Sequence, residues 1–159
     1  MKITILCVGK IKERFMRDAI SEYQKRLTRY VKLDIVEVPD EKTPDHASEK
    51  EEVQIRQREG EKIFRHIKND DYVIALAIDG KQCDSVSFAE KIEQYGITGK
   101  SNVVYVIGGS LGLSETVLNR ADEKISFSKM TFPHQLMRVI LMEQIYRAYR
   151  IIKKEPYHK

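Results

Sequence analysis

The stretch from Val103 to Phe132 constrains the fold of this chain more than any other part of its sequence. It begins with an apolar run of strand length, Val103 to Ile107, which passes directly into a glycine-containing turn, Gly108 to Gly112. An unbroken apolar run is typical of a strand covered on both faces, and glycines after such a strand let a ligand approach the backbone closely. The stretch therefore predicts a ligand-binding edge of an α/β sheet, with a simple tight turn as the alternative.

The residues that follow add a further strand and helix. We expect a short helix over Ser114 to Ala121, a strand over Lys124 to Phe127 and then a loop up to Phe132. Proline suits the first turn of a helix, because its φ is already helical and its missing N–H has no partner there. A long helix is therefore predicted from Pro133 to Ile152.

Three pairs of strand and helix precede this stretch. The expected strands are Ile3 to Val8, Leu33 to Val38 and Tyr72 to Ile78, and the expected helices are Ile11 to Leu27, Ala47 to Ile67 and Ser87 to Tyr95. Asp79 and Gly80 are expected to turn the chain after the third strand, and Ser87 with Glu90 has the spacing of a capping box. Five such units without linkers or repeats predict one α/β domain, residues 1–159, with a mainly parallel five-stranded sheet.

The composition is that of an ordered domain without membrane segments or metal ligands. Apolar residues make up 42% and charged residues 33% of the chain, and its apolar runs are far shorter than the roughly 20 residues that cross a membrane. No cleavage site follows the apolar start of the chain, so we expect a cytoplasmic protein without membrane contact. Cys7 and Cys83, expected to be buried strand or turn thiols, and the four histidines lack ligand spacing, which predicts no metal.

Positive charge is concentrated at the two ends of the chain. Residues 10–32 contain eight Lys or Arg and three acids, residues 138–159 contain six and two, and residues 40–62 contain five and eight. A face built from both ends would suit a polyanion such as RNA. Two solvated helices would give the same counts, so charge alone leaves both alternatives open.

Two glycine motifs lack the spacing of nucleotide-binding signatures. Gly96 to Ser101 has two residues between its glycines where a P-loop has four, and a strand follows it rather than a helix. The turn at Gly108 lacks the Gly-x-Gly-x-x-Gly pattern, and the next strand ends in Ser128 and Lys129 rather than in the acid that binds an adenosine ribose. We therefore disfavour an ATPase, a GTPase or a nicotinamide-dependent enzyme.

Four ordered motifs carry a specific resemblance to a known family. They are Ile107 to Gly112, Phe132 to Gln135, Glu143 to Ala148 and Pro156 to His158. Together they resemble the SPOUT-class rRNA methyltransferases, which methylate N3 of a pseudouridine in large-subunit (23S) rRNA, and the resemblance covers the whole chain. It implies a C-terminal trefoil knot, a rare exception to unknotted topology, and S-adenosylmethionine as the cofactor.

The resemblance assigns the cofactor contacts to the end of one strand and to two loops. The residues are Leu76, Gly108, Phe127, Ser128, Lys129, Met130, Thr131 and Phe132. Leu76 and Phe132 can pack against an adenine, and a glycine lets a bent ligand approach the backbone. Taken without the resemblance, Leu76 would be a core residue.

The same resemblance places the catalytic groups in the C-terminal tail, at Tyr157 and His158. Histidine titrates near neutral pH and can take the proton that N3 loses, while tyrosine can stack on the target base or hydrogen-bond its carbonyl. Arg147 is a candidate RNA or dimer contact and Lys159 a candidate RNA contact, although relatives usually carry arginine where this chain has Lys159. The alternatives are a frayed terminus and, for Arg147, an exposed ion pair with Glu143.

The long C-terminal helix carries more apolar surface than one sheet face covers. Its apolar side chains wrap widely around it, at Leu136, Val139, Ile140, Leu141, Met142, Ile145, Tyr146 and Tyr149. A second apolar stripe predicts a twofold homodimer. The resemblance implies that the tail of one subunit then works with the cofactor of the other.

The expected substrate is the rRNA of the assembled ribosome, because a small domain with scattered basic residues makes few phosphate contacts of its own. Two alternatives stay open. One is a noncatalytic ribosome- or RNA-binding factor that uses the same basic face. The other is a SPOUT methyltransferase that acts on tRNA or on ribose hydroxyls, which the lack of a separate RNA-binding domain disfavours.

Overall fold

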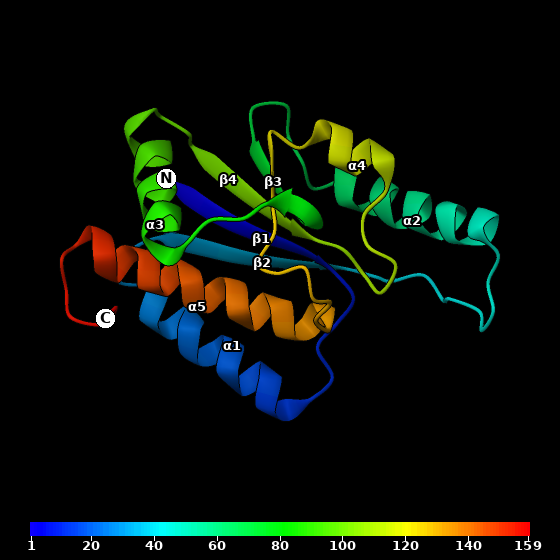
Figure 1. The fold of residues 1–159 in the computed structure, drawn as a ribbon, viewed down its shortest axis with the longest axis horizontal. Coiled ribbons are helices and arrows are strands. Elements are labelled where there is room, and N and C mark those ends of the chain that lie inside the picture. The colour runs from blue at the N-terminus through cyan, green and yellow to red at the C-terminus, as the bar shows by residue number, and fades with distance from the viewer.

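The computed structural model describes residues 1–159, and at its centre lies one sheet of five strands in the order β2-β1-β4-β3-β5 (Figure 1). The strands are β1 (Lys2–Val8), β2 (Lys32–Val38), β3 (Tyr72–Lys81), β4 (Asn102–Ile107) and β5 (Glu123–Ile125). Every pairing between neighbouring strands is parallel. The predicted α/β class and the parallel five-stranded sheet are confirmed.

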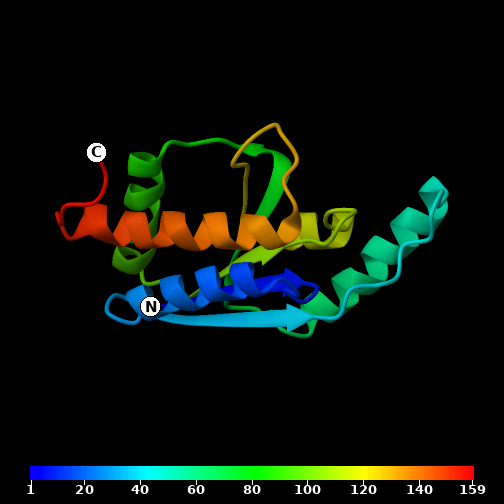
Figure 2. The same ribbon diagram turned by 90° about the horizontal axis from the view of Figure 1, so that it is seen from below.

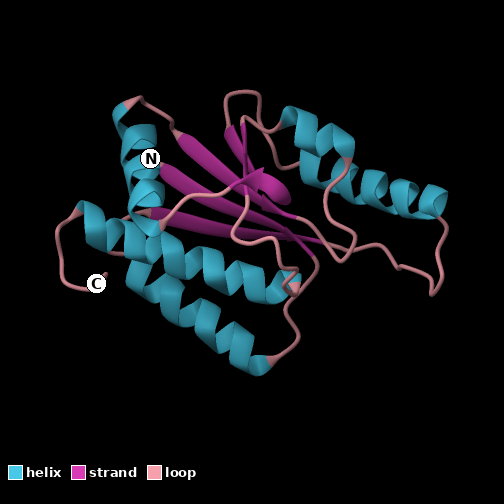
Figure 3. Ribbon diagram, viewed as in Figure 1, coloured by secondary structure: helices cyan, strands magenta, loops and turns pink.

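Helices cover both faces of the sheet (Figures 2 and 3). α1 (Arg14–Leu27), α3 (Ser85–Ile97) and α5 (His134–Ile152) lie on one face, and α2 (Glu49–Phe64) and α4 (Glu115–Arg120) lie on the other. Side chains alternate along each strand, so in β1 Ile3 and Ile5 enter the larger core while Leu6 and Val8 enter the smaller one. None of the helices combines the length and the apolar character that crossing a membrane requires.

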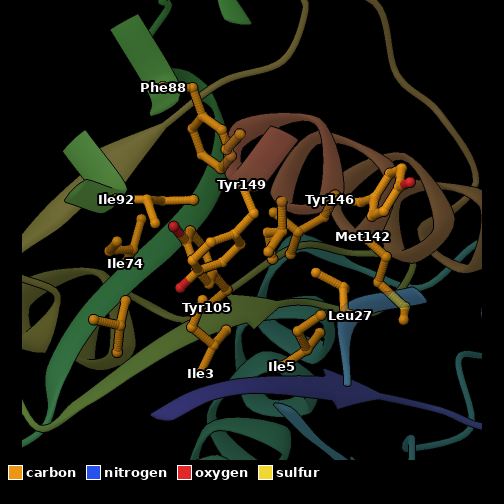
Figure 4. Packing of buried hydrophobic residues seen from close by; sticks show 14 of the residues in the cluster. Ile3, Ile5, Leu27, Ile74, Phe88, Ile92, Tyr105, Met142, Tyr146 and Tyr149 are labelled. Atoms are coloured by element: carbon orange, nitrogen blue, oxygen red, sulfur yellow. The ribbon is translucent and has the colours of Figure 1, made fainter. Parts of the chain in front are cut away.

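The larger core lies between α5 and the sheet (Figure 4). Tyr105 of β4, Ile5 of β1 and Met142 of α5 are completely buried in it, and Tyr149 of α5 is nearly so. Full burial of a large apolar side chain is worth about 1.5–3 kcal/mol. The core therefore fixes the position of α5 on the sheet.

The start of α3 differs from the prediction. The capping box predicted at Ser87 is wrong, because α3 begins at Ser85 and Asp84 caps it. The Asp84 carboxylate accepts a hydrogen bond from the backbone N–H of Ser87 at 2.8 Å. Aspartate is as good an N-cap as serine. The helix can therefore be capped three residues earlier than the capping-box spacing predicted, at Asp84.

The end of β3 also differs from the prediction. The turn predicted at Asp79 and Gly80 is wrong, because β3 continues to Lys81. A Cβ at position 80 would lie 2.6 Å from the backbone carbonyl carbon of Ile125. Gly80 is therefore required by the close approach of β5 rather than by a turn.

The C-terminal segment lies against the connection between β3 and α3. The backbone N–H of Ser126 donates to the carbonyl of Lys81 (3.1 Å), and the Ser85 hydroxyl donates to the side chain of Gln144 in α5 (2.8 Å). The trefoil knot itself stays a prediction from the resemblance.

Gly80→Ala should destabilise the protein by about 1–3 kcal/mol, because the added methyl group must push β5 away. Urea denaturation measures the effect. The matched control is Gly96→Ala in α3, where a Cβ meets no heavy atom within 4 Å and alanine should stabilise the helix by up to about 1 kcal/mol. Equal stability of Gly80→Ala and the wild type would contradict the close approach.

Candidate active site

A cleft of about 900 Å³ opens at the carboxyl ends of β3, β4 and β5. Its walls are the end of β3, the turn after β4, the loop after β5 and the start of α5. Ligands of open α/β sheets bind at this edge, and the volume is that of a small-molecule site. The ligand-binding edge predicted from Val103 to Phe132 coincides with this cleft.

Most residues predicted to contact a cofactor line the cleft. They are Leu76, Gly108, Phe127, Ser128, Met130, Thr131 and Phe132, whereas Lys129 is not among the lining residues. Leu76 also packs partly against the larger core. It therefore lies both at the wall of the cleft and at the edge of the core, the two locations that the sequence analysis considered. That these residues bind a cofactor stays a prediction.

The turn after β4 folds back on itself. Gly112 has a φ of 82°, and its N–H donates to the carbonyl of Gly109 at 3.0 Å. A Cβ on Gly108 would lie 2.7 Å from the backbone carbonyl carbon of Gly112. The tight turn is confirmed, and it forms one wall of the cleft at the same time.

The loop after β5 is held by its own hydrogen bonds. The Ser126 hydroxyl donates to the carbonyl of Ser128 (2.9 Å), and the Ser128 hydroxyl accepts from the backbone N–H of Met130 (2.9 Å). The Met130 side chain is 73% exposed. The loop therefore presents a fixed backbone to the cleft.

Two buried charged residues near the cleft are not marked by any pattern in the sequence. Arg138 of α5 is 2% exposed and donates to Glu37 at 2.6 Å. Glu59 of α2 is 4% exposed and accepts from the backbone N–H of Glu41 at 2.9 Å, and a Cβ on Gly109 would lie 3.4 Å from its carboxylate. The one hint in the sequence is that Arg138 stands among apolar residues of α5, which is consistent with a buried position.

The C-terminal tail folds back onto the middle of α5. The Tyr157 hydroxyl donates to Glu143 Oε1 at 3.1 Å. Arg147 donates to the same oxygen at 2.6 Å and to Nδ1 of His158 at 3.1 Å. The predicted pair of Glu143 and Arg147 exists, but it is part of a network that holds the tail in place, so the terminus is not frayed.

A second arginine fixes the chain just before Tyr157. Arg150 donates to Glu155 Oε2 (2.5 Å) and to the carbonyl of Pro156 (2.8 Å). The hydroxyl of Tyr30 donates to the same carboxylate oxygen at 2.6 Å. Lys159 is exposed, and its contact with RNA stays a prediction.

The tail and the cleft are separate within one chain. Neither Tyr157 nor His158 lines the cleft, whereas Met137 near the start of α5 does. Arg147 follows Met137 by a distance of about 15 Å along the helix axis, at 1.5 Å per residue. The structure therefore does not bring the predicted catalytic pair into the predicted cofactor site of the same chain.

The two cysteines lie in different environments. Cys7 is buried as expected, and burial raises its pKa to about 12. The expectation of burial is wrong for Cys83, which is exposed. No three His, Cys, Asp or Glu side chains gather into a group that could hold a metal ion.

Known proteins are similar to this chain along its whole length. The model of a family described as predicted SPOUT methyltransferase matches residues 1–158. Three relatives carry the name "Ribosomal RNA large subunit methyltransferase H", and each matches over 100% of both chains. The identity is 65% with the protein of Clostridium novyi (strain NT), 63% with that of Bifidobacterium adolescentis and 62% with that of Clostridium beijerinckii.

Glu59→Gln should stabilise the protein at neutral pH. Burial raises the pKa of Glu59 above its ordinary value of 4.5, so the folded state binds this proton more tightly than the unfolded state. The ionised carboxylate therefore costs stability above the raised pKa, and this cost is lost as the pH falls through it. Urea denaturation at about pH 7 and about pH 4 should show a gain only at the higher pH.

The matched control for this variant is Glu61→Gln, at an exposed position on the same helix, which should change stability at neither pH. A loss of stability in Glu59→Gln at neutral pH would contradict the expected cost of the buried charge.

Proposed function

The chain belongs to the family of SPOUT methyltransferases, and from this we propose that it transfers a methyl group from S-adenosylmethionine to N3 of a pseudouridine in large-subunit rRNA. The observation that carries the proposal is the cleft, because the strand end and loops that the resemblance assigns to the cofactor surround one cavity. The names of the relatives that match along their whole length support large-subunit rRNA as the class of substrate.

The lining of the cleft fits the proposed cofactor. Leu76 and Phe132 can enclose the adenine, and the loop from Ser126 to Phe132 offers fixed amides and carbonyls to its polar edge. Gly108 and Gly109, which line the cleft in the turn after β4, add no side-chain bulk to that wall. When bound, the cofactor supplies an electrophilic methyl group on a sulfonium.

Methylation requires groups beside N3 that stabilise the ring as its proton leaves. Tyr157 and His158 are the proposed groups. Burial, together with the hydrogen bond to Glu143, raises the pKa of Tyr157 to about 12. Its hydroxyl therefore stays protonated at neutral pH and donates its one hydrogen to Glu143, so Tyr157 serves as a stacking surface rather than as a base.

A twofold homodimer would join the cleft of one subunit to the tail of the other. On α5, Leu136 and Ile140 are only half-buried and do not belong to the larger core, and Phe15 of α1 is 68% exposed. A second subunit packed on these side chains would bury them. The same contact accounts for a tail that lies outside the cleft of its own chain.

The placement of positive charge supports an RNA substrate. The hydrogen bond from Tyr30, and after it the charges of Arg150, Arg29 and Lys153, lower the pKa of Glu155. The two basic ends of the chain therefore meet beside the tail, where α1 and α5 lie side by side (Figure 1). Because so few cations make few phosphate contacts, we propose the assembled ribosome as the substrate.

Ribosomes that lack the modification should accept a labelled methyl group, and mapping should place it at N3 of a pseudouridine. Protein-free 23S rRNA should be a much poorer substrate, and equal activity on it would contradict the assembled ribosome as the substrate. Label on tRNA or on a ribose hydroxyl would indicate another SPOUT activity. Cofactor binding without transfer to any RNA would favour a noncatalytic ribosome-binding factor.

Two inactive variants should restore activity when they share a dimer. Gly108→Leu damages the cleft and His158→Ala removes a tail group, so random pairing gives heterodimers with one complete site and about a quarter of the wild-type activity. Each variant alone is the control. No recovery in a verified heterodimer would show that the cleft and the tail of the same chain work together.

A further inference from the structure

We propose that Arg147 fixes the tautomer of His158, so that the tail presents an N–H donor rather than a base to the target nucleobase. This inference rests on the proposed methyl transfer and assigns roles within it. Arg147 is a positioning residue here, because it contacts His158 rather than the substrate.

The contact between Arg147 and His158 has only one possible direction. Nη1 of Arg147 lies 3.1 Å from Nδ1 of His158. A guanidinium carries five N–H donors and no acceptor, so Nδ1 must be the acceptor. In a neutral imidazole one ring nitrogen accepts and the other carries the hydrogen, which places the hydrogen on Nε2.

The orientation of Arg147 is itself fixed by further contacts. Its Nη2 and Nε donate to Glu143 Oε1 at 2.6 and 3.0 Å, and the guanidinium lies 4.8 Å from the centroid of the Tyr157 ring. The two charged side chains are 25% and 20% exposed. A planar guanidinium held at a carboxylate and an aromatic ring has little freedom to turn away from His158.

The other charged groups around His158 leave this arrangement in place. Asp84, the cap of α3, is the acidic group of the neighbouring element near His158, and hydrogen bonds from Ser87 are the main cause of its lowered pKa. Its carboxylate bonds to the N–H of Ser87 at 2.8 Å. Lys159, the next residue, is a donor as well, and Glu143 reaches His158 only through Arg147.

A donor at Nε2 suits the chemistry at N3. As the N3–H bond breaks, its electron pair forms the bond to the methyl carbon, the bond from carbon to sulfur breaks to leave a thioether, and the proton leaves to water. The negative charge that develops on the ring is shared with the flanking carbonyl oxygens, where a positioned N–H stabilises it. His158 keeps the same hydrogen throughout, so no proton has to leave the tail after each turnover.

Replacing His158 by glutamine or by asparagine distinguishes a hydrogen-bond donor from a base. Glutamine can place its NH2 group near the position of Nε2, asparagine reaches only the position of Nδ1, and neither accepts a proton at neutral pH. We expect His158→Gln to keep kcat within about tenfold of the wild type, and His158→Asn and His158→Ala to lose about 10²–10³-fold. If His158→Gln is as inactive as His158→Ala while the wild type methylates ribosomes, the donor role is overturned.

The pH dependence gives a second comparison of the same variants. If His158 is a donor, a fall of kcat at acidic pH does not come from protonation of a catalytic imidazole base. Any such acidic limb of the pH profile should therefore persist in His158→Gln. Loss of that limb in His158→Gln would overturn the inference.

Substitutions of Arg147 test the positioning role. Arg147→Met should lower kcat about tenfold or more, as lost partners of a functional histidine do, with the KM for ribosomes unchanged. Arg147→Lys, which keeps a donor, should lose less. A higher KM with an unchanged kcat in Arg147→Met would make Arg147 an RNA contact instead.

Nitrogen-15 NMR of the imidazole rings gives a readout independent of activity. His158, assigned by its absence in His158→Gln, should carry its hydrogen on Nε2 at the pH of the assay. Hydrogen on Nδ1 would overturn the inference even if ribosomes are methylated. Hydrogen on Nε2 without methylation of any RNA would reject the proposed function, and with it the donor role, while the tautomer would stand.

Discussion

The packing of α5 against the sheet is the contact on which both parts of the candidate site depend. Leu141 and Ile145 are completely buried in this contact, each worth about 1.5–3 kcal/mol. The start of the helix closes the cleft at His134, and its middle supplies Glu143 and Arg147 to the tail. Because one rigid helix carries both parts, the distance between them is set by the core rather than by flexible loops.

That arrangement gives the tail its order at the surface of the protein. Tyr157 packs partly against the larger core, whereas His158 is exposed. Both are held by hydrogen bonds to side chains of α5. Hydrogen bonds to charged groups are worth roughly 1.5–3 kcal/mol each. A short tail can therefore keep a defined geometry and still be accessible to a nucleobase.

Much of the fold could be predicted because its strongest patterns are local. The apolar run from Val103 to Ile107 is long enough to identify a buried strand, and the glycines after it mark the turn at the sheet edge. The failures fall where several residues satisfy the same local rule. Both Asp84 and Ser87 suit an N-cap, and Gly80 suits either a turn or a close contact, so only the packing decides.

The candidate site was less predictable, because its contacts join residues that are far apart in the sequence. The cleft residues came from the resemblance, and Leu76 alone would have looked like a core residue. Glu59 resembles the exposed charges around it on α2, and nothing in the sequence shows that it lies beside Gly109. The hydrogen bond between Tyr30 and Glu155 likewise corresponds to no periodic pattern in the sequence.

The most direct test of the account is a calorimetric titration of the protein with S-adenosylmethionine. Saturable binding is predicted for the wild type and for the control variant Gly96→Leu, whose added side chain begins in open space. In Gly108→Leu the side chain must displace the backbone of Gly112, so binding should be lost while the fold is retained. Absence of binding to the wild type, or equal binding by Gly108→Leu, would contradict the assignment of this cleft to the cofactor.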